Sequence, residues 1–398
     1  MQWPICGLGE SVKIRYIPVG WQQLIHNKTR LLIAVTGVAF SVLLLLAQQG
    51  IHTVMSEGNL RWHNALAYDL VILNPATEVL TQLEGISTDS IELASSVEGV
   101  AGVTAVSIAQ ADWHNPVDPS ISRPIFVVGI KPENLSFQNT LNPEHTALLK
   151  LPGHFLFDAR SHPDYGPVPA LLARGNSLSV GLNEKTIVVS GLFEIGRSFG
   201  INGALLASRA SFEELFSDKP ATTRSLGLVH LKASVDPSTV QENLEERLGD
   251  SVIVLKNKQF KQRETRYWSY RTPTGYALAL GTVISLLVGA IVVYQVLCAE
   301  LREHHCEYAM LKAIGYNDRF FSRLVLQEAL ILAIAGFVPG AIIGAQLLNQ
   351  AETATGLPLA MTAPGTIKAL LLTLLMSTGA GYLAKRKLIM IRPADALQ

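Results

Sequence analysis

The sequence carries unusually little charge. Lys, Arg, Asp and Glu make up 16% of its 398 residues, whereas about 25% is usual in soluble proteins. The formal net charge is zero, so the composition predicts no general attraction to nucleic acid. The three cysteines are Cys6, Cys298 and Cys306, and none lies in the long polar middle of the chain. The sequence therefore indicates no disulfide framework.

The familiar catalytic motifs are also absent from the sequence. No stretch reads G-x-x-x-x-G-K-[ST], and the segment Gly181–Thr186 (GLNEKT) lacks a second glycine before its lysine. Neither a G-x-S-x-G elbow nor an H-E-x-x-H pair occurs. We therefore predict a non-catalytic chain without cofactor or metal, and we expect another protein to hydrolyse any ATP. Five histidines of the polar middle show no ligand spacing: His114, His145, His154, His162 and His230.

What the sequence does contain is four long apolar runs, at residues 31–51, 275–299, 324–348 and 366–384. A helix of about 20 largely apolar residues crosses the hydrocarbon core of a bilayer, so each run predicts a transmembrane helix. The first run is longer than the apolar core of a signal peptide, and no small-x-small cleavage site follows it. We expect it to remain in place as a signal anchor.

Basic residues divide the segments around these runs into two classes. Residues 1–30, which we interpret as an amphipathic segment, 300–323 and 385–398 are rich in Lys and Arg, whereas the loop 349–365 has neither. Short loops rich in Lys and Arg stay in the cytoplasm. We therefore predict that both termini are cytoplasmic, and that residues 56–272 and the loop 349–365 lie outside.

The segment 56–272 is expected to fold as an α+β domain, because β-branched stretches alternate with helical ones. A β-α-β order occurs near each end, with Thr88 or Asp89 as the cap of the first helix, and with Asp236 before Pro237 at the start of the second. We expect the two halves to pair in one small sheet. Residues 135–222 would be an inserted subdomain. The expected strands are 68–74, 103–109, 123–130, 186–192, 204–207, 226–234 and 251–255, and the expected helices are 88–97 and 236–248.

A basic stretch, KNKQFKQRETRYWSYR, leads from this domain into the second apolar run. Basic residues mixed with aromatic ones also occur in nucleic-acid-binding segments. Here they directly precede a membrane helix, where Tyr267, Trp268 and Tyr270 suit an interfacial aromatic belt. We predict no nucleic-acid binding, but a stalk that forms one lever with the second membrane helix, interrupted near Thr272–Pro273. The stalk residues are Lys256, Lys258, Lys261, Arg263, Arg266 and Trp268.

The stretch REHHCEYAMLKAIGY, between the second and third runs, looks at first like a metal site. Successive residues on a helix point about 100° apart, so His304, His305 and Cys306 cannot converge on one ion. His304 with Glu307 has the spacing of helical ligands, but two ligands make a weak site. Glu300, with Glu303 and Glu307 on the same side, predicts a solvated acidic face.

The same stretch instead predicts a short helix and a tight turn. Gly315 is placed to end the helix in a left-handed cap. Asn317 or Asp318 is then placed to cap the next helix. Such a helix would lie on the membrane or dock into a groove of a partner.

From Arg302 onward, the sequence REHHCEYAMLKAIGYNDRFFSRLVLQEALIL resembles the signature of FtsX-like, MacB-type ABC transporter permeases. NKTRLLIAVTGVAFSV is similar to their first helix, and RPADALQ is similar to their tail, so the resemblance covers the whole chain. GWQQL, HHCEYAMLKAIGY and KRKLIMIRPADAL together resemble most the DevC branch, which is found in cyanobacteria. MacB itself carries a fused nucleotide-binding domain, which this sequence lacks. The matching residues are Arg302, Glu307, Leu311, Lys312, Ala313, Ile314, Gly315 and Glu328.

The resemblance implies a homodimeric permease in the bacterial inner membrane, with a MacB-like periplasmic core domain and a separate ABC ATPase. ATP-driven movement would pass through helices 1 and 2 to the periplasmic domain. In DevC-like systems this domain works with a membrane-fusion adaptor and a TolC-like outer-membrane duct, and the cargo is an envelope glycolipid. The implied ATPase-docking residues are Arg302, Glu303, Glu307, Leu311, Lys312, Ala313, Ile314 and Gly315.

Two other roles fit the same architecture. One is an FtsX-type transducer that activates a periplasmic cell-wall hydrolase, and the other is a lipoprotein-releasing permease. The size of the segment 56–272 favours an exporter that docks an adaptor. A membrane enzyme or receptor would need a site in this segment, and the sequence indicates none.

Glu328 lies about one turn inside the third predicted helix, where an ionisable residue is a functional candidate. Alternatively, its side chain reaches the interface or pairs with Arg323 or Arg319. Proline and glycine predict a kink in this helix and close approach of the fourth helix to its neighbours; the residues are Pro339 and Gly340, and Gly379 and Gly381.

Overall fold

The computed structural model describes residues 27–132, 143–175, 177–217, 222–355, 357, 359 and 361–389. Most of the predicted amphipathic segment, the end of the predicted tail and part of the predicted insertion therefore lie outside the described residues. The chain divides into two compact units. The helical unit contains the described residues up to Ala47, Gly281–Gln346 and the described residues from Met361 on, and the sheet domain contains Gln48–Leu280 and Leu347–Ala360.

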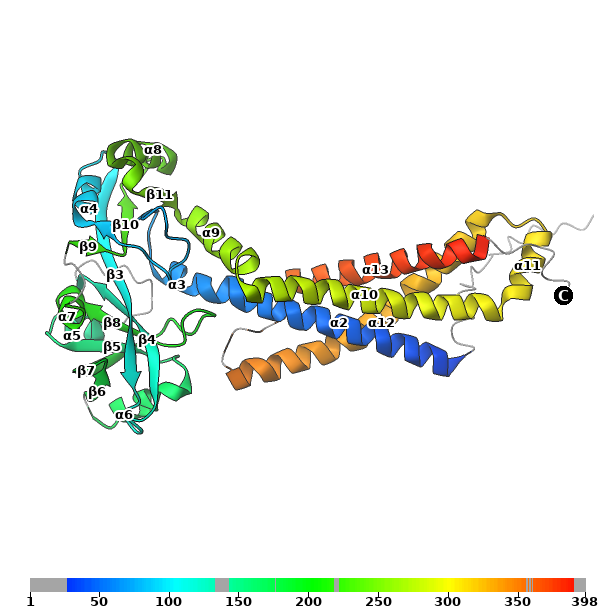
Figure 1. The fold of residues 1–398 in the computed structure, drawn as a ribbon, viewed down its shortest axis with the longest axis horizontal. Helices are drawn as coiled ribbons and strands as arrows, with labels where there is room; N and C mark the ends of the chain where they lie inside the picture. The colour runs from blue at the N-terminus through cyan, green and yellow to red at the C-terminus, as the bar shows by residue number, and fades with distance from the viewer. Residues whose placement is uncertain are drawn as a thin grey trace, which may run out of the picture. The chain divides into compact units, whose positions relative to one another are not determined.

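Within the described part of the chain, four helices are long and apolar enough to cross a membrane. Each contains one of the predicted runs and continues beyond it, because polar residues at the ends of an apolar run can extend the same helix. The predicted fold class, four transmembrane helices with an α+β domain between the first two, is confirmed. The helices are α2 (Lys28–Thr53), α10 (Pro273–Glu303), α12 (Asp318–Thr355) and α13 (Ala363–Ile389), and the short helix α11 (His305–Ala313) joins α10 to α12 (Figure 1).

Three glycines spaced four residues apart bring α12 close to α2. They are Gly336, Gly340 and Gly344. A Cβ atom on Gly340 would lie 2.7 Å from the backbone oxygen of Ala39. Small residues at such positions let two helix backbones approach within a membrane. Helix α12 continues through Pro339, and Gly340, which we predicted to help kink the helix, forms this contact.

The two glycines predicted to allow close approach in α13 differ. A Cβ atom on Gly381 would lie 3.1 Å from the Cβ of Ala329 in α12, so this position does allow a close contact. Gly379 faces open space, with none of the described atoms within 4 Å of such a Cβ. The prediction is therefore correct at one position and wrong at the other.

The sheet domain is built around one sheet with the strand order β11-β1-β10-β3-β4-β8-β5-β7-β6 (Figure 1). A separate small sheet pairs β2 with β9. The strands are β1 (Leu70–Leu73), β2 (Ile86–Ser87), β3 (Val100–His114), β4 (Ser122–Ile130), β5 (His154–Asp158), β6 (Leu178–Leu182), β7 (Lys185–Phe193), β8 (Ala204–Ser208), β9 (Thr223–Arg224), β10 (Leu226–Leu231) and β11 (Ile253–Lys256).

Short helices connect and cover these strands. The second predicted helix has Asp236 at its N-cap position and Pro237 first, as predicted. In the first, the cap is Ser87, whose Oγ accepts a hydrogen bond from the Asp89 N–H at 3.1 Å, and the predicted caps Thr88 or Asp89 are wrong. The helices are α3 (Asn59–Ala65), α4 (Thr88–Ser95), α5 (Pro143–Leu148), α6 (Val168–Leu172), α7 (Arg209–Leu215), α8 (Pro237–Leu248) and α9 (Asn257–Tyr270), with shorter turns η1 (Val54–Gly58), η3 (Pro163–Tyr165) and η4 (Gly249–Ser251).

The two predicted β-α-β halves share the main sheet, but their strands interleave. β1 pairs antiparallel with both β10 and β11, and β10 pairs with β3. β3 then extends to His114, where exposed Gln110 and Asp112 alternate with buried Ala109, Ala111 and Trp113. This long strand pairs with β4 and continues the sheet into the region that we expected to be a separate subdomain. The region extends the same sheet, and that expectation is corrected.

Helices α4 and α8 fix the end of the sheet that carries β1, β10 and β11. Ile91 and Ala94 of α4 and Val240 and Leu244 of α8 form one buried cluster with residues of these strands. Because β11 leads directly into α9 and β1 lies beside β11, this end of the sheet also sets the start of the predicted stalk.

Candidate functional site

Helix α11 ends in the predicted glycine turn. Gly315 has φ +103°, a conformation that glycine adopts without steric cost. Its N–H donates to the carbonyl oxygen of Lys312 at 3.1 Å, and the N–H of Tyr316 donates to that of Leu311 at 3.1 Å. These two bonds form a Schellman motif, which satisfies the last carbonyl groups of the helix. Helix α12 begins at Asp318, so the reversal between the two helices takes only four residues.

The two faces of α11 have different surroundings. Tyr308 and Ala309 are buried, and the Tyr308 ring lies edge-on to Phe321 of α12, with 5.9 Å between ring centroids. On the other side, Met310 and Ile314 are 56% and 76% exposed. The helix is therefore held by one face and presents apolar side chains on the other.

The structure exposes most of the residues for which the resemblance implies ATPase docking. Lys312 and Leu311 are half-buried, and the Lys312 Nζ lies 3.7 Å from an oxygen of Asp318. The sequence reasoning did not include Met310 and Tyr316, which are exposed beside the docking residues. The exposed members of the docking set are Arg302, Glu303, Glu307, Ala313, Ile314 and Gly315.

The predicted solvated acidic face is wrong at Glu300. This residue is 3% exposed, and its carboxylate lies 3.7 Å from Nη1 of Arg30 and 3.3 Å from Nε2 of His304. Arg30 also pairs with Glu303, and the second ring nitrogen of His304 lies 3.1 Å from Glu307. These contacts bracket the break between α10 and α11 and tie the start of α2 to the end of α10.

His304 thus contacts carboxylates. In the described part of the chain, no three His, Cys, Asp or Glu side chains are grouped so that they could hold a metal ion.

Glu328 is fully buried among the membrane-spanning helices. Neither of its carboxylate oxygens has a hydrogen-bond partner among the described residues. It does not reach the surface, and the structure shows no ion pair with Arg319 or Arg323. Burying such a group without a partner is costly, so the position remains a functional candidate.

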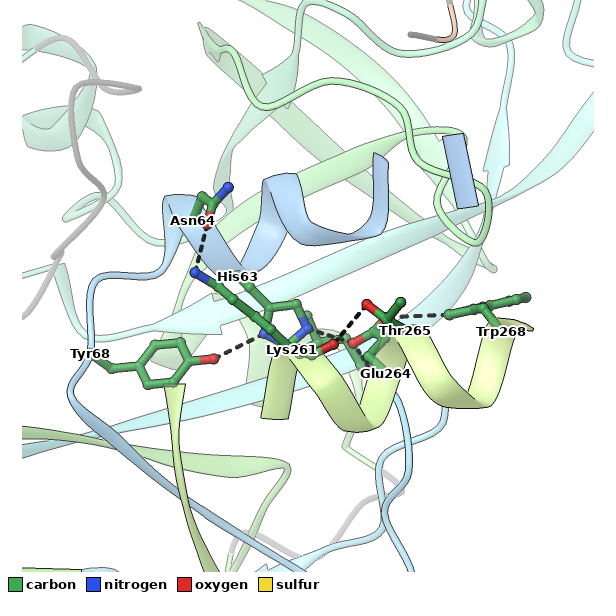
Figure 2. Close-up of polar contacts among 8 residues, drawn as sticks. His63, Asn64, Tyr68, Lys261, Glu264, Thr265 and Trp268 are labelled. Atoms are coloured by element: carbon green, nitrogen blue, oxygen red, sulfur yellow. Dashed lines mark hydrogen bonds and ion pairs between the residues drawn. The ribbon is translucent and has the colours of Figure 1, made fainter. Parts of the chain in front are cut away.

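A buried polar network in the sheet domain connects the chain that follows α2 to the stalk. Helix α3 follows α2 through η1 without a break, and α9 leads into α10. Figure 2 shows His63 of α3 between Tyr68 and Glu264 of α9. Its Nδ1 lies 2.9 Å from the Tyr68 hydroxyl, and its Nε2 lies 2.5 Å from Oε2 of Glu264. Both ring nitrogens therefore have partners.

The surroundings of this network leave its carboxylate well satisfied. Glu264 is 2% exposed, and it also accepts hydrogen bonds from the Leu80 N–H and the Trp268 indole N–H, each at 3.4 Å. The His63 ring stacks edge-on against Phe260 at 4.6 Å. Burial, together with the nearby Glu264 carboxylate, raises the pKa of Tyr68 above its ordinary value, so its hydroxyl keeps the proton. A complete set of partners of this kind makes a buried network rigid.

The predicted stalk is helix α9, and a break at Arg271–Thr272 separates it from α10. Its basic side chains divide into two groups. Three bond to the sheet domain, namely Lys256 to Ser238 at 2.8 Å, Lys261 to Asn64 at 2.7 Å, and Arg263 to the Pro75 carbonyl at 3.0 Å. The other two, Lys258 and Arg266, are exposed.

The aromatic residues of the stalk do not form one belt. Trp268 is half-buried and packs on Phe199 of the sheet domain, with 5.3 Å between ring centroids. The interfacial-belt prediction is therefore wrong for Trp268. Tyr270 is 81% exposed and remains suited to that role.

Comparison with known proteins finds a family that is similar to the C-terminal part of the chain. Residues 279–393 match the family described as FtsX-like permease C-terminal. This part of the chain is therefore similar to the C-terminal domain of FtsX-like permeases, and we call it the FtsX-like domain. Helices α11, α12 and α13 lie within it, with Glu328 and the glycine turn, whereas the His63–Glu264 network lies outside it.

The chain is similar to curated sequence relatives and to solved structures. Proteins named "Pyoverdine export ATP-binding/permease protein PvdT" from Pseudomonas syringae pv. tomato and Pseudomonas putida are 31% and 29% identical to this chain over 129 residues, which is 32% of this chain. The chain covers 20% of the length of each.

Two solved structures are also similar. The extracellular domain of the noncanonic ABC-type transporter YknZ from Gram-positive bacteria has a TM-score of 0.33 and 12% identity, and covers 48% of this chain and 99% of its own. The periplasmic region of MacB from Actinobacillus actinomycetemcomitans has a TM-score of 0.36 and 14% identity, and covers 51% of this chain and 94% of its own.

Sequence reasoning identified the turn of the FtsX-like domain but missed His63 and Glu264. One signal was present. Glu264 is the single acidic residue in the basic stretch from Lys256 to Arg271. An isolated acid among six basic residues indicates a specific partner, but nothing in the sequence indicates which of the ten histidines that partner is.

Proposed function

We propose that this chain is the non-catalytic permease subunit of an ABC-type exporter, and that a separate ATPase subunit drives it. The observation that carries the proposal is the exposed apolar face of α11, beside a tight turn in an FtsX-like domain. Met310, Ile314 and Tyr316 are between 46% and 76% exposed there. Large apolar side chains gathered on a fixed surface mark an interaction site, and a short helix with one free apolar face suits docking into a groove.

The proposal places the chain in the bacterial inner membrane, with α11 and both termini in the cytoplasm and the sheet domain in the periplasm. If all four long helices cross, the sheet domain and α11 lie on opposite sides. The distribution of Lys and Arg then supports this orientation, because the segment 300–323 around α11 contains Lys and Arg, whereas the loop 349–365 has neither.

We further propose that α2 and α10 transmit movement together. Near the ends that we place in the cytoplasm, Arg30 of α2 pairs with Glu300 and Glu303 of α10. Beyond the opposite ends, His63 and Glu264 join their continuations α3 and α9. Two helices tied at both ends cannot slide past each other without breaking the Arg30 ion pairs or the His63–Glu264 hydrogen bond. A shift imposed on α11 would therefore reach the sheet domain through both.

The remaining parts of the proposal concern assembly and cargo. Two copies of the permease would sit on a pair of ATPases, and the sheet domain would engage a membrane-fusion adaptor and a TolC-like outer-membrane protein. The cargo would be a lipid, glycolipid or other envelope substrate, as in the DevC branch. The export function in the names of the PvdT relatives supports an export role.

The test is co-purification of the full-length chain with its ATPase. We expect Ile314→Asp to reduce the recovered ATPase at least tenfold, because the substitution puts a charge into the docking face. The matched control is Leu151→Asp, which changes a 46% exposed leucine of the sheet domain and should leave recovery unchanged. If Ile314→Asp recovers as much ATPase as the unmodified chain, α11 is not the docking surface.

A second comparison tests the docking residues implied by the resemblance. Reversing Glu307 and Lys312 together should weaken association less than Ile314→Asp does. The reason is that Lys312 is half-buried and lies near Asp318, so it offers little of its charge to a partner. A larger loss from the charge reversal would assign the docking to charge and not to the apolar face.

A further inference from the structure

A cleft of about 970 Å³ lies along α9, between this helix and the chain that follows α2. Five of the described residues that line it are Lys or Arg, and one, Glu78, is acidic. Glu78 already pairs with Arg271. The cleft therefore has an excess of positive charge that its own walls do not neutralise.

The exposed side chains of α9 form one stripe beside this cleft. Lys258, Gln262, Arg266 and Tyr270 follow each other at four-residue steps, and all four are exposed. Residues four apart lie on the same face of a helix. The opposite face carries buried Phe260 and Glu264 and holds α9 to the sheet domain. The stripe thus belongs to a helix whose orientation is fixed by the packing of its opposite face against the sheet domain.

Burial disfavours the charged form of one lysine in the cleft. It lowers the pKa of Lys261, whose Nζ donates to the neutral side-chain oxygen of Asn64. An ammonium group that is partly buried without an opposite charge is stabilised by any anion that comes beside it.

The cleft ends close to the start of α10, a helix apolar enough to cross a membrane. Arg266 lies seven residues before Pro273, the first residue of α10, and seven residues of helix extend at most about 10 Å. Tyr270 and Tyr276, 81% and 71% exposed, stand on either side of the break, where tyrosine is favoured in the headgroup region. The guanidinium of Arg266 is therefore within reach of lipid headgroups.

We propose that this cleft is a binding site for an anionic membrane lipid, held by its headgroup phosphate at Arg266, with Lys258 further along the same stripe. The guanidinium supplies two parallel N–H donors for phosphate oxygens, and basic residues close to a membrane surface attract anionic lipids.

The observations favour a lipid over a soluble anion or an acidic protein. The positive stripe continues into a membrane helix, and the tyrosines that flank the break suit the interface. A soluble anion would need none of these features. The proposal concerns binding to the chain itself, so it holds whether or not the chain exports anything.

The experiment uses the full-length chain in detergent and titrates it with dioleoyl phosphatidylglycerol or dioleoyl phosphatidylcholine. Native mass spectrometry counts the lipids bound at each concentration. The variants are Arg266→Glu, Arg266→Gln and Lys258→Glu. The matched controls are Arg247→Glu and Lys232→Glu, which reverse exposed basic residues elsewhere in the sheet domain. Inorganic phosphate is added as a competitor in a separate series.

We expect the unmodified chain to bind phosphatidylglycerol in preference to phosphatidylcholine. One basic residue near a membrane contributes about a fivefold change in affinity for anionic lipid. Arg266→Gln should therefore weaken phosphatidylglycerol binding about fivefold, and Arg266→Glu by more. Lys258→Glu should have a smaller effect, because Lys258 lies further from the membrane, and the controls should bind as the unmodified chain does.

Three results would each overturn the proposal. The first is equal binding of the two lipids. The second is an equal loss in the Arg247→Glu or Lys232→Glu controls, which would reduce the effect to net charge. The third is full competition by inorganic phosphate at concentrations equal to the lipid, which would assign the cleft to a soluble anion. Because Arg266 is exposed, Arg266→Gln leaves the fold intact and allows each of these results to be read.

Discussion

Glu264 in the sheet domain and Glu328 in the FtsX-like domain are both buried, with 2% and 0% of their surface exposed. Glu264 faces His63 and two further N–H donors, whereas the oxygens of Glu328 have no partner among the described residues. Removing one partner of a buried, paired carboxylate strongly destabilises the fold, because the remaining charge is left without compensation. A buried carboxyl without partners is instead a cost that the packing around it must offset. Burial alone therefore does not indicate whether a carboxylate stabilises the fold.

The largest expected effect comes from removing the partner of Glu264. His63→Ala leaves this carboxylate buried and unpaired, and we expect it to lower the free energy of unfolding of the sheet domain by about 3–5 kcal/mol. Hydrogen exchange of the full-length chain should show the loss first in α3 and α9, because the network joins these helices. Urea denaturation monitored by tryptophan fluorescence would give the magnitude.

The control for this prediction replaces both partners. His63→Leu together with Glu264→Leu removes the charge and the group that balances it, and such replacements of buried pairs are often close to neutral. We expect the double variant to be far more stable than His63→Ala. Equal losses in the two would show that packing of the histidine ring against Phe260, and not its hydrogen bond to Glu264, holds α3 to α9.

The second prediction concerns the membrane-spanning helices, where we expect a substitution to increase stability. Glu328→Leu removes a buried carboxyl whose oxygens have no partner among the described residues, and we expect it to stabilise the FtsX-like domain by about 1–3 kcal/mol. Thermal unfolding of the full-length chain in nanodiscs measures the change. Glu307→Leu, at an exposed position of α11, should change stability by less than about 0.5 kcal/mol.

A lower unfolding temperature for Glu328→Leu would contradict the comparison, because it would mean that the carboxyl has a stabilising partner. If the variant is more stable but fails to couple to the ATPase, the unsatisfied carboxyl is retained for function, and stability and activity oppose each other at this position.

The difference between the two carboxylates also marks what could be predicted from the sequence. Apolar runs, β-branched stretches and the glycine turn depend on neighbouring residues, so the spans, most strands and the Gly315 cap were predicted correctly. His63 and Glu264 are 201 residues apart along the chain, and no local pattern connects them. The burial of Glu300 depends in the same way on Arg30, 270 residues earlier.

Other errors have physical causes of the same kind. The insertion was expected to be a subdomain because it lies between the two β-α-β halves, but the alternation of β3 continues to His114, and its partner β4 pairs with β8 of the insertion. The docking set omitted Met310 because matching residues to a family signature does not show which face of a helix is exposed. Tryptophan is favoured at a membrane interface, but in the folded chain Trp268 packs against Phe199, which the sequence does not place beside it.

A third prediction tests whether the membrane-spanning helices are held by close contact. Gly340→Ala would push a methyl group against the Ala39 backbone oxygen, which cannot move aside, and we expect a loss of about 1–3 kcal/mol. The matched control is Gly379→Ala, at a position that faces open space. There the better helix propensity of alanine should stabilise the helix by up to about 1 kcal/mol. Opposite shifts of the unfolding temperature in nanodiscs would support contact packing, and equal shifts would contradict it.

The smallest expected effect concerns a third buried carboxylate, Asp158 at the end of β5, which is 1% exposed. It accepts hydrogen bonds from the backbone N–H groups of Arg160, Ile195 and Gly196 at 3.1, 3.3 and 2.8 Å. Burial nevertheless raises the pKa of Asp158 above its ordinary value of 3.8, and the hydrogen bonds only oppose this. In energetic terms Asp158 is therefore intermediate between Glu264 and Glu328. It has hydrogen-bond partners, but they do not fully offset the cost of burying its charge.

The sign of the pH dependence follows from this shift. Between pH 3.8 and the raised pKa of the folded state, folded Asp158 holds its proton more tightly than the unfolded chain does. Stability therefore falls as pH rises through this interval and is constant above it. Asp158→Asn cannot titrate, so the unfolding free energy of the unmodified chain minus that of the variant should fall over the same interval, while other groups cancel. A difference that rises with pH would show that the three N–H groups outweigh burial, and would make Asp158 a carboxylate that stabilises the fold.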